Sequence, residues 1–144
     1  MLLSISLTAA AAIALLHIWL SVRTSQVRRS AKIELGDGGS EPLTRRMRAH
    51  ANFVENAPFF LALLVLLELA GASAPFLWAA VIVFIIARLC HAFGMDRRGA
   101  NPLRIVGIVG SLTAIGALAI WAITLTYARA GEAPQRQEAP TITV

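Results

Sequence analysis

The chain has 144 residues, of which 57% are hydrophobic and 15% are charged, and its formal net charge is +5. A typical soluble domain is about 45–50% apolar and about 25% charged, so this composition favours a membrane protein of one domain. The positive charge is concentrated in two loops, and we expect no nucleic-acid partner. The single cysteine, Cys90, excludes an internal disulfide, and we predict no metal site.

Four mostly apolar segments are each long enough to cross a bilayer as a helix, which takes about 20 residues. Basic residues follow the first segment instead of preceding it, so we interpret it as a retained helix and not as a signal peptide. The segments are Leu2–Val22, Thr44–Ala70, Pro75–Phe93 and Leu103–Tyr127.

These segments predict an all-α integral membrane protein, a bundle of four transmembrane helices in one domain over residues 1–127. The polar residues 128–144, which include two prolines, are expected to form a flexible tail.

Lysine and arginine residues are unevenly distributed between the loops. Seven lie from Arg23 to Arg48, four lie from Arg88 to Arg104, and the turn Gly71–Ala74 has none. Positive residues collect in cytoplasmic loops. We therefore predict that loops one and three face the cytoplasm and that both termini lie on the opposite side of the membrane.

The second segment begins with polar residues at helical spacing. Arg48, Asn52 and Glu55 follow one another at i, i+4 and i+7 and share one helix face, whereas His50 points away from it. Ionisable groups at membrane depth are costly and normally have a partner. An arginine beside an acid and an amide suits a small anionic ligand that also carries an ammonium group. The alternative is a buried structural network of Arg48, Glu55 and Arg88 without a ligand.

The other helices contribute polar residues to the same end of the bundle. Arg88 and His91 lie one turn apart near the end of the third segment, Arg104 begins the fourth, and Arg23 follows the first. The predicted topology places all of them in one cytoplasmic layer.

Two further polar residues lie inside apolar segments. We interpret His17 as a hydrogen-bonding residue of the bundle interior, and Glu68 as a solvated residue at the opposite membrane interface.

The motif Arg48-Ala-His-Ala-Asn52-Phe-Val-Glu55-Asn-Ala-Pro58 resembles the MAPEG family, the membrane-associated proteins of eicosanoid and glutathione metabolism. It contains all of the family's pattern Arg-x-x-x-Asn-x-x-Glu-x-x-Pro. The segment Ala87-Arg-Leu-Cys-His-Ala-Phe-Gly94 is similar to the end of the family's third helix.

The resemblance implies a homotrimer of four-helix subunits, with glutathione as co-substrate bound between subunits near the cytoplasmic face. It implies that Arg48, Asn52 and Glu55 hold the glutathione backbone with help from Arg88. Arg104, followed by Gly107, is similar to the arginine that activates the glutathione thiol, and is therefore the candidate catalytic residue. Arg23 corresponds to an arginine at the end of the first helix.

The chain departs from the eukaryotic members of the family at two candidate binding positions. Asn56 stands where a tyrosine often follows the glutamate, and His91 stands where an aromatic ring often packs on glutathione. The single tyrosine, Tyr127, is at the far end of the fourth segment. The short chain resembles the family's bacterial branch, which implies the bacterial inner membrane.

The leading hypothesis is a glutathione-dependent membrane transferase or peroxidase that acts on lipophilic small molecules from the bilayer. A second is a non-catalytic lipid- or glutathione-binding protein of the same family. A third is a small four-helix multidrug transporter. Such a transporter is expected to have an acidic residue in the middle of its first helix, and Leu2–Val22 contains none.

Overall fold

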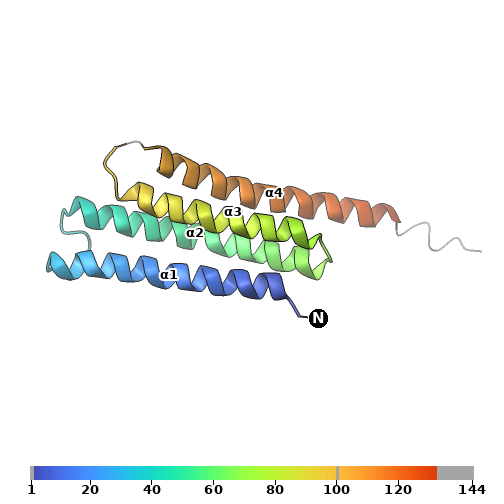
Figure 1. Ribbon diagram of the computed structural model, residues 1–144, viewed down its shortest axis with the longest axis horizontal. Coiled ribbons are helices and arrows are strands. Elements are labelled where there is room, and N and C mark those ends of the chain that lie inside the picture. Colours follow the sequence, from blue (N-terminus) through green and yellow to red (C-terminus); the bar gives the residue numbers. More distant parts are fainter. Residues whose placement is uncertain (1, 100, 133–144) are drawn as a thin grey trace, which may run out of the picture.

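The computed structural model describes residues 2–99 and 101–132, and in this part of the chain every regular element is an α-helix. Successive helices run in opposite directions and pack side by side as one bundle (Figure 1). All are long and apolar enough to cross a membrane, which confirms the predicted fold class. The helices are α1 (Ser4–Ser30), α2 (Glu41–Leu69), α3 (Ala74–Met95) and α4 (Pro102–Glu132).

Several helices extend beyond the apolar segments that predicted them. α1 continues past Val22 to Ser30, and α2 starts before its apolar run because Ser40 accepts a hydrogen bond from the Leu43 N–H at its N-terminus. α4 continues to Glu132, so residues 128–132 of the predicted tail are helical. Residues 133–144 lie outside the described part of the chain.

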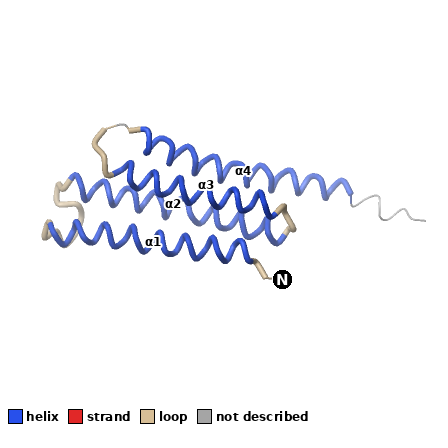
Figure 2. Tube along the Cα trace, in the orientation of Figure 1, coloured by secondary structure: helices blue, strands red, loops and turns tan. Residues whose placement is uncertain are grey.

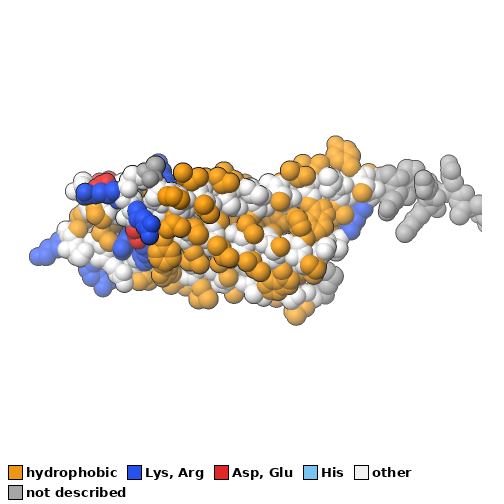
Figure 3. Space-filling view, turned by 45° about the horizontal axis from the view of Figure 1, so that its top comes forward, with side chains coloured by type: hydrophobic (Ala, Val, Ile, Leu, Met, Phe, Trp, Pro, Cys, Tyr) orange, Lys and Arg blue, Asp and Glu red, His pale blue; other side chains and the backbone are white. Residues whose placement is uncertain are grey.

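The loop 31–40 and the loop residues 96–99 and 101 lie at one end of the bundle, and the turn 70–73 lies at the other (Figure 2). We call the end with the two loops the basic end. There Asp96 forms ion pairs with Arg23 and Arg46, and Arg46 donates to the Arg23 carbonyl at 2.8 Å. The space-filling view shows charged side chains gathered at this end and apolar side chains over the middle (Figure 3). Loops one and three therefore share one end, as the predicted topology requires.

The interior of the bundle is filled by aromatic and aliphatic side chains. Phe60 of α2 and Phe84 of α3 stack with their ring centroids 4.0 Å apart, and both are fully buried with Leu64 and Leu118. Large apolar side chains such as Phe59 also point outward on the chain surface. An apolar exterior around a packed interior is the arrangement that lipid surroundings favour.

The structure contradicts the expectation that Glu68 is solvated. Its side chain is buried, and its carboxylate accepts hydrogen bonds from the backbone N–H groups of Ile5 at 3.0 Å and Ser6 at 2.7 Å. It also accepts from the Ser6 hydroxyl at 2.5 Å. The first N–H groups of a helix have no partner within that helix. Glu68 satisfies two of them and fastens the start of α1 to the end of α2.

Candidate functional site

At the basic end, α3 and α4 approach each other with their backbones nearly in contact. A Cβ atom built on Gly107 would lie 2.5 Å from the backbone nitrogen of His91. One built on Gly94 would lie 2.5 Å from the backbone nitrogen of Arg104. Only glycine permits such an approach of two helices. These two contacts place His91 and Arg104 close together although they belong to different helices.

Asn101 fixes the point where α4 begins. Its buried side chain donates to the Gly94 carbonyl at 2.7 Å and accepts from the Arg104 N–H at 3.1 Å. This residue was not among the predicted site residues. The sequence does contain a signal for it, because an asparagine followed by Pro102 before an apolar run is typical of a helix N-terminus.

A cavity of about 350 Å³ lies at this end between α2, α3 and α4. Its volume is within the range of about 300–1,000 Å³ that is typical of small-molecule sites. Five of the predicted site residues line it and so come together as expected, and three further lining residues lie one helical turn from a predicted one. The predicted residues are Arg48, Asn52, Glu55, His91 and Arg104, and the additional ones are Ala51, Met95 and Ile108.

The charged groups of this cavity lack partners within the described part of the chain. There, no ion pair or side-chain hydrogen bond involves Arg48, Glu55 or the guanidinium of Arg104, and all three side chains are exposed. The ring of His91 is buried, and its Nδ1 atom has no hydrogen-bond partner there. A buried polar atom without a partner costs free energy. This geometry argues against the buried structural network without a ligand, because such a network would pair these groups with one another.

Arg88 lies behind the cavity and does not line it. Its side chain is almost completely buried, and it donates from Nη1 to the Asn52 side-chain oxygen at 2.8 Å. From Nη2 it donates to the Gly107 carbonyl of α4 at 3.1 Å. Because the oxygen of Asn52 is engaged, the amide N–H₂ is the part of that side chain left for a ligand. Arg88 therefore joins α3 to both α2 and α4 and orients Asn52.

The two other predicted binding residues also lie outside the cavity of the single chain. Asn56 donates to the Asn52 carbonyl at 2.7 Å, so it supports the helix beneath the cavity. Arg23 is paired with Asp96, and its guanidinium lies 4.4 Å from the centre of the Trp19 ring on α1. The contacts of Asn56 with Asn52 and of Arg23 with Trp19 join residues four positions apart on one helix, whereas the pairing of Arg23 with Asp96 depends on how the helices pack.

Four membrane-crossing helices define a small integral membrane protein, and the charged cavity at the basic end is its candidate binding site. The MAPEG family profile matches residues 6–124, and the chain belongs to this family. It is similar to the inner membrane protein YecN of Escherichia coli strain K12, and to the protein of the same name from Escherichia coli O6:H1 strain CFT073. In each case 85 residues align with 32% identity, which is 59% of this chain and 65% of the relative. The alignment thus spans slightly less than two thirds of each relative's length.

Proposed function

We propose that this protein is a glutathione-dependent membrane transferase that joins the glutathione thiolate to lipophilic electrophiles. One observation carries the proposal. Arg48, Glu55 and Arg104 meet in a cavity of small-molecule size, and none of their charged groups has a partner among the described residues.

The charges of the cavity match those of glutathione, which has two carboxylates and one ammonium group. Arginine binds a carboxylate through two parallel hydrogen bonds, so Arg48 suits one end of the tripeptide. Glu55 suits the ammonium group. The amide N–H₂ of Asn52, held in place by Arg88, donates to a carbonyl or carboxylate oxygen.

Arg104 is the proposed activator of the thiol. A free thiol has a pKa of about 8.5, and only the thiolate is a strong nucleophile. A nearby positive charge lowers such a pKa by about 1–3 units. The thiol proton passes to water, the thiolate sulfur forms a bond to the electrophilic carbon, and the leaving group departs with the electron pair of its broken bond.

A peroxidase reaction uses the same thiolate. The sulfur attacks the terminal oxygen of a lipid hydroperoxide, the O–O bond breaks, and the lipid alcohol leaves after taking a proton. A second glutathione then converts the sulfenic acid into a disulfide and water. Both reactions need a lipophilic substrate that arrives from the bilayer.

The proposal includes a homotrimer in the bacterial inner membrane with the basic end toward the cytoplasm. Arg48 and Glu55 are exposed on the single chain, so the cavity has one open side that a neighbouring subunit can close. Native mass spectrometry in mild detergent should show three subunits. A dominant monomer would contradict both the trimer and a site between subunits.

A non-catalytic binding protein is the second candidate, and one observation favours it. The single tyrosine, Tyr127, is exposed near the far end of α4, and the residues that line the cavity include no phenol. A protein of this kind would bind glutathione or a lipid without activating the thiol.

Isothermal titration of the purified protein with glutathione tests the proposal. We expect saturable binding of the tripeptide, and much weaker binding of γ-glutamylcysteine, which lacks the glycine carboxylate. The absence of binding in folded protein would overturn the glutathione proposal in both its catalytic and its binding-only forms.

A further inference from the structure

Two histidines from different helices meet on the side of α2 that faces away from the candidate cavity. Nδ1 of His17 on α1 lies 3.1 Å from Nε2 of His50 on α2, and the ring centroids are 4.7 Å apart. Each ring has only the other as a side-chain hydrogen-bond partner in the described part of the chain. His50 points away from the cavity, as the sequence predicted. His17 makes the expected hydrogen bond, but it is exposed on the chain surface and not in the bundle interior.

The separation of the two nitrogen atoms suits a single metal ion as well as a hydrogen bond. Zinc binds imidazole nitrogen at about 2.0–2.1 Å in tetrahedral geometry, which places two such nitrogens about 3.4 Å apart. The observed 3.1 Å differs from this by a few tenths of an ångström, so the nitrogens need little change in separation, while rotation of the rings must turn both lone pairs toward the ion. It needs the tautomers in which both facing nitrogens carry lone pairs.

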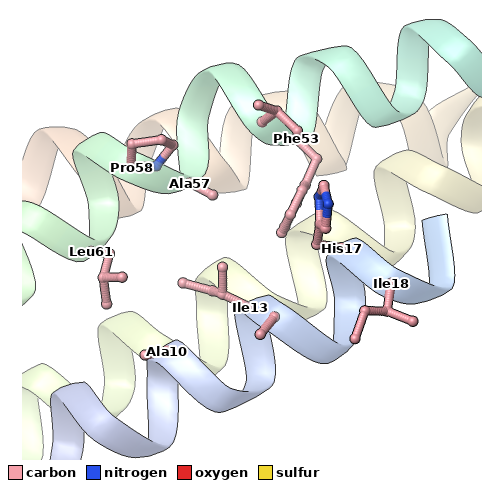
Figure 4. A pocket seen from close by; sticks show the side chains of 10 residues that line it. Ala10, Ile13, His17, Ile18, Phe53, Ala57, Pro58 and Leu61 are labelled. Carbon is pink, nitrogen blue, oxygen red and sulfur yellow. The ribbon is translucent and has the colours of Figure 1, made fainter. Parts of the chain in front are cut away.

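The surroundings decide which ions fit. His17 lines a groove of about 600 Å³ between α1 and α2, whose other lining residues, such as Ile13 and Ala57, are apolar (Figure 4). His17 projects from α1 beside Phe53 of α2 in this view. No carboxylate lines the groove. Imidazole without carboxylate favours zinc, copper and nickel over magnesium and calcium.

The pair lies toward the basic end of the bundle, and His17 is exposed on the chain surface. His17 precedes Arg23 of the basic end by six residues, which is about 9 Å along the helix. The described part of the chain contains no group of three or more possible metal-binding side chains. An ion held by the two histidines would therefore take its remaining ligands from water.

We propose that His17 and His50 form a two-histidine site for a divalent transition-metal ion, Zn²⁺ or Cu²⁺, that bridges α1 and α2. This site is separate from the candidate cavity and is independent of the proposed glutathione chemistry. Metal binding to the folded chain stabilises it by mass action, because the two ligands, 33 positions apart in the sequence, are held together only in the fold.

The chain has three histidines, and this gives a matched set of variants. His17→Ala and His50→Ala each remove one ligand, and His91→Ala removes the histidine that lies elsewhere. Tag-free protein in detergent is titrated with Zn²⁺ by calorimetry and with Cu²⁺ by electron paramagnetic resonance. We expect one ion per chain, hyperfine coupling to two nitrogens, and a melting temperature that rises with Zn²⁺ concentration.

Loss of either ligand should weaken binding about 10–100-fold or more, since even loss of an outer-shell partner weakens metal sites by this factor. His91→Ala should bind as the wild type does. The proposal is overturned if wild type binds no metal, which would leave a hydrogen-bonded pair only, or if binding survives in both His17→Ala and His50→Ala. It is also overturned if His91→Ala folds as the wild type does and yet loses metal binding. If an alanine variant does not fold, His17→Gln and His50→Gln keep a polar side chain at the same place and must still lose the metal.

Discussion

Glu55 and Glu68 belong to the same helix, α2, but they differ in burial and in hydrogen bonding. Glu68 is buried at one end of the bundle, and three hydrogen bonds from α1 satisfy its carboxylate. Glu55 is exposed at the basic end and lines the cavity, and no ion pair or hydrogen bond to it exists among the described residues.

The difference separates a structural carboxylate from a candidate ligand-binding one. An acid in a membrane helix needs a partner. The fold supplies that partner for Glu68 from the start of α1, where free N–H groups are available. For Glu55 the described part of the chain supplies only a cavity lined by two arginines, which supports the proposal that its partner is a ligand. We expect loss of Glu68 to affect stability and loss of Glu55 to affect binding.

The largest effect should come from Gly107→Ala, which pushes α4 away from α3 at the cavity end and leaves the Glu68 end intact. The new Cβ would lie 2.5 Å from the His91 backbone nitrogen. Overpacking against backbone is costly, and we expect a loss of about 3 kcal/mol in the free energy of unfolding together with loss of glutathione binding.

Gly116→Ala is the matched control for this variant, because a Cβ at Gly116 meets no atom within 4 Å. It should melt at or slightly above the wild-type temperature, since alanine is the better helix former. Identical thermal melts and titrations for the two variants would contradict the close helix contact.

Arg104→Ala tests whether the cavity of Glu55 performs chemistry in addition to binding. Removing the guanidinium should raise the pKa of the bound thiol by about 1–3 units and lower turnover more than glutathione affinity. The ultraviolet band of the bound thiolate should fade at neutral pH, and Arg104→Lys should recover part of it because a positive charge remains. If wild type binds glutathione at neutral pH without a thiolate band, the binding-only function replaces the catalytic one.

Glu55→Gln and Arg48→Ala test the binding half of the comparison. Each variant removes a charge-assisted hydrogen bond to the ligand, which is worth about 1.5–3 kcal/mol, or roughly tenfold or more in affinity. The thermal melt should not change, because neither side chain has an internal partner among the described residues. Folded variants that bind glutathione as tightly as wild type would show that this face has only a structural role.

Glu68→Ala tests the structural half of the comparison. It removes the acceptor for two N–H groups of α1, and we expect a loss of about 1–2 kcal/mol in the free energy of unfolding. Glutathione affinity should be unchanged, and Glu68→Gln, which keeps one acceptor oxygen, should melt between Glu68→Ala and wild type. A variant that loses affinity but not stability would reverse the assignment of the two glutamates.

The smallest effect concerns Asp37, a carboxylate in the loop before α2. Hydrogen bonds from the Gly39 N–H at 3.1 Å and from the Thr44 hydroxyl at 2.8 Å lower the pKa of Asp37 below its ordinary value. A lowered pKa contributes stability above the unfolded pKa of about 3.9, and this contribution disappears as pH falls through the folded value. Asp37→Asn should therefore melt slightly below wild type at pH 7, and the difference should shrink below about pH 4. A difference that stays constant with pH would exclude this carboxylate as its cause.

The sequence predicted much of the candidate site because helical spacing is local. Arg48, Asn52 and Glu55 share a face through the geometry of one helix, and all three line the cavity. Arg88 shows the limit of predicting a site from helical spacing. Its position near the end of α3 was predicted correctly, but its contacts with Asn52 and Gly107 depend on how three helices pack. A buried arginine whose role is to orient another residue cannot be distinguished by spacing from one that contacts a ligand.

The sequence by itself determined that the chain has four membrane-crossing helices and that loops one and three share a basic end. The length of each hydrophobic segment and the distribution of charged residues can be read directly from the sequence, because neither depends on how the helices pack. The family followed from the motif that runs from Arg48 to Pro58.

Only the tertiary structure decided which polar groups find partners. Glu68 and Glu55 belong to the same helix, yet Glu68 meets the start of α1 and Glu55 faces a cavity. The same packing brings His17 and His50 within 3.1 Å. These pairs are separated by 33 or more residues, and contacts between helices depend on their rotation and offset, which no local pattern specifies.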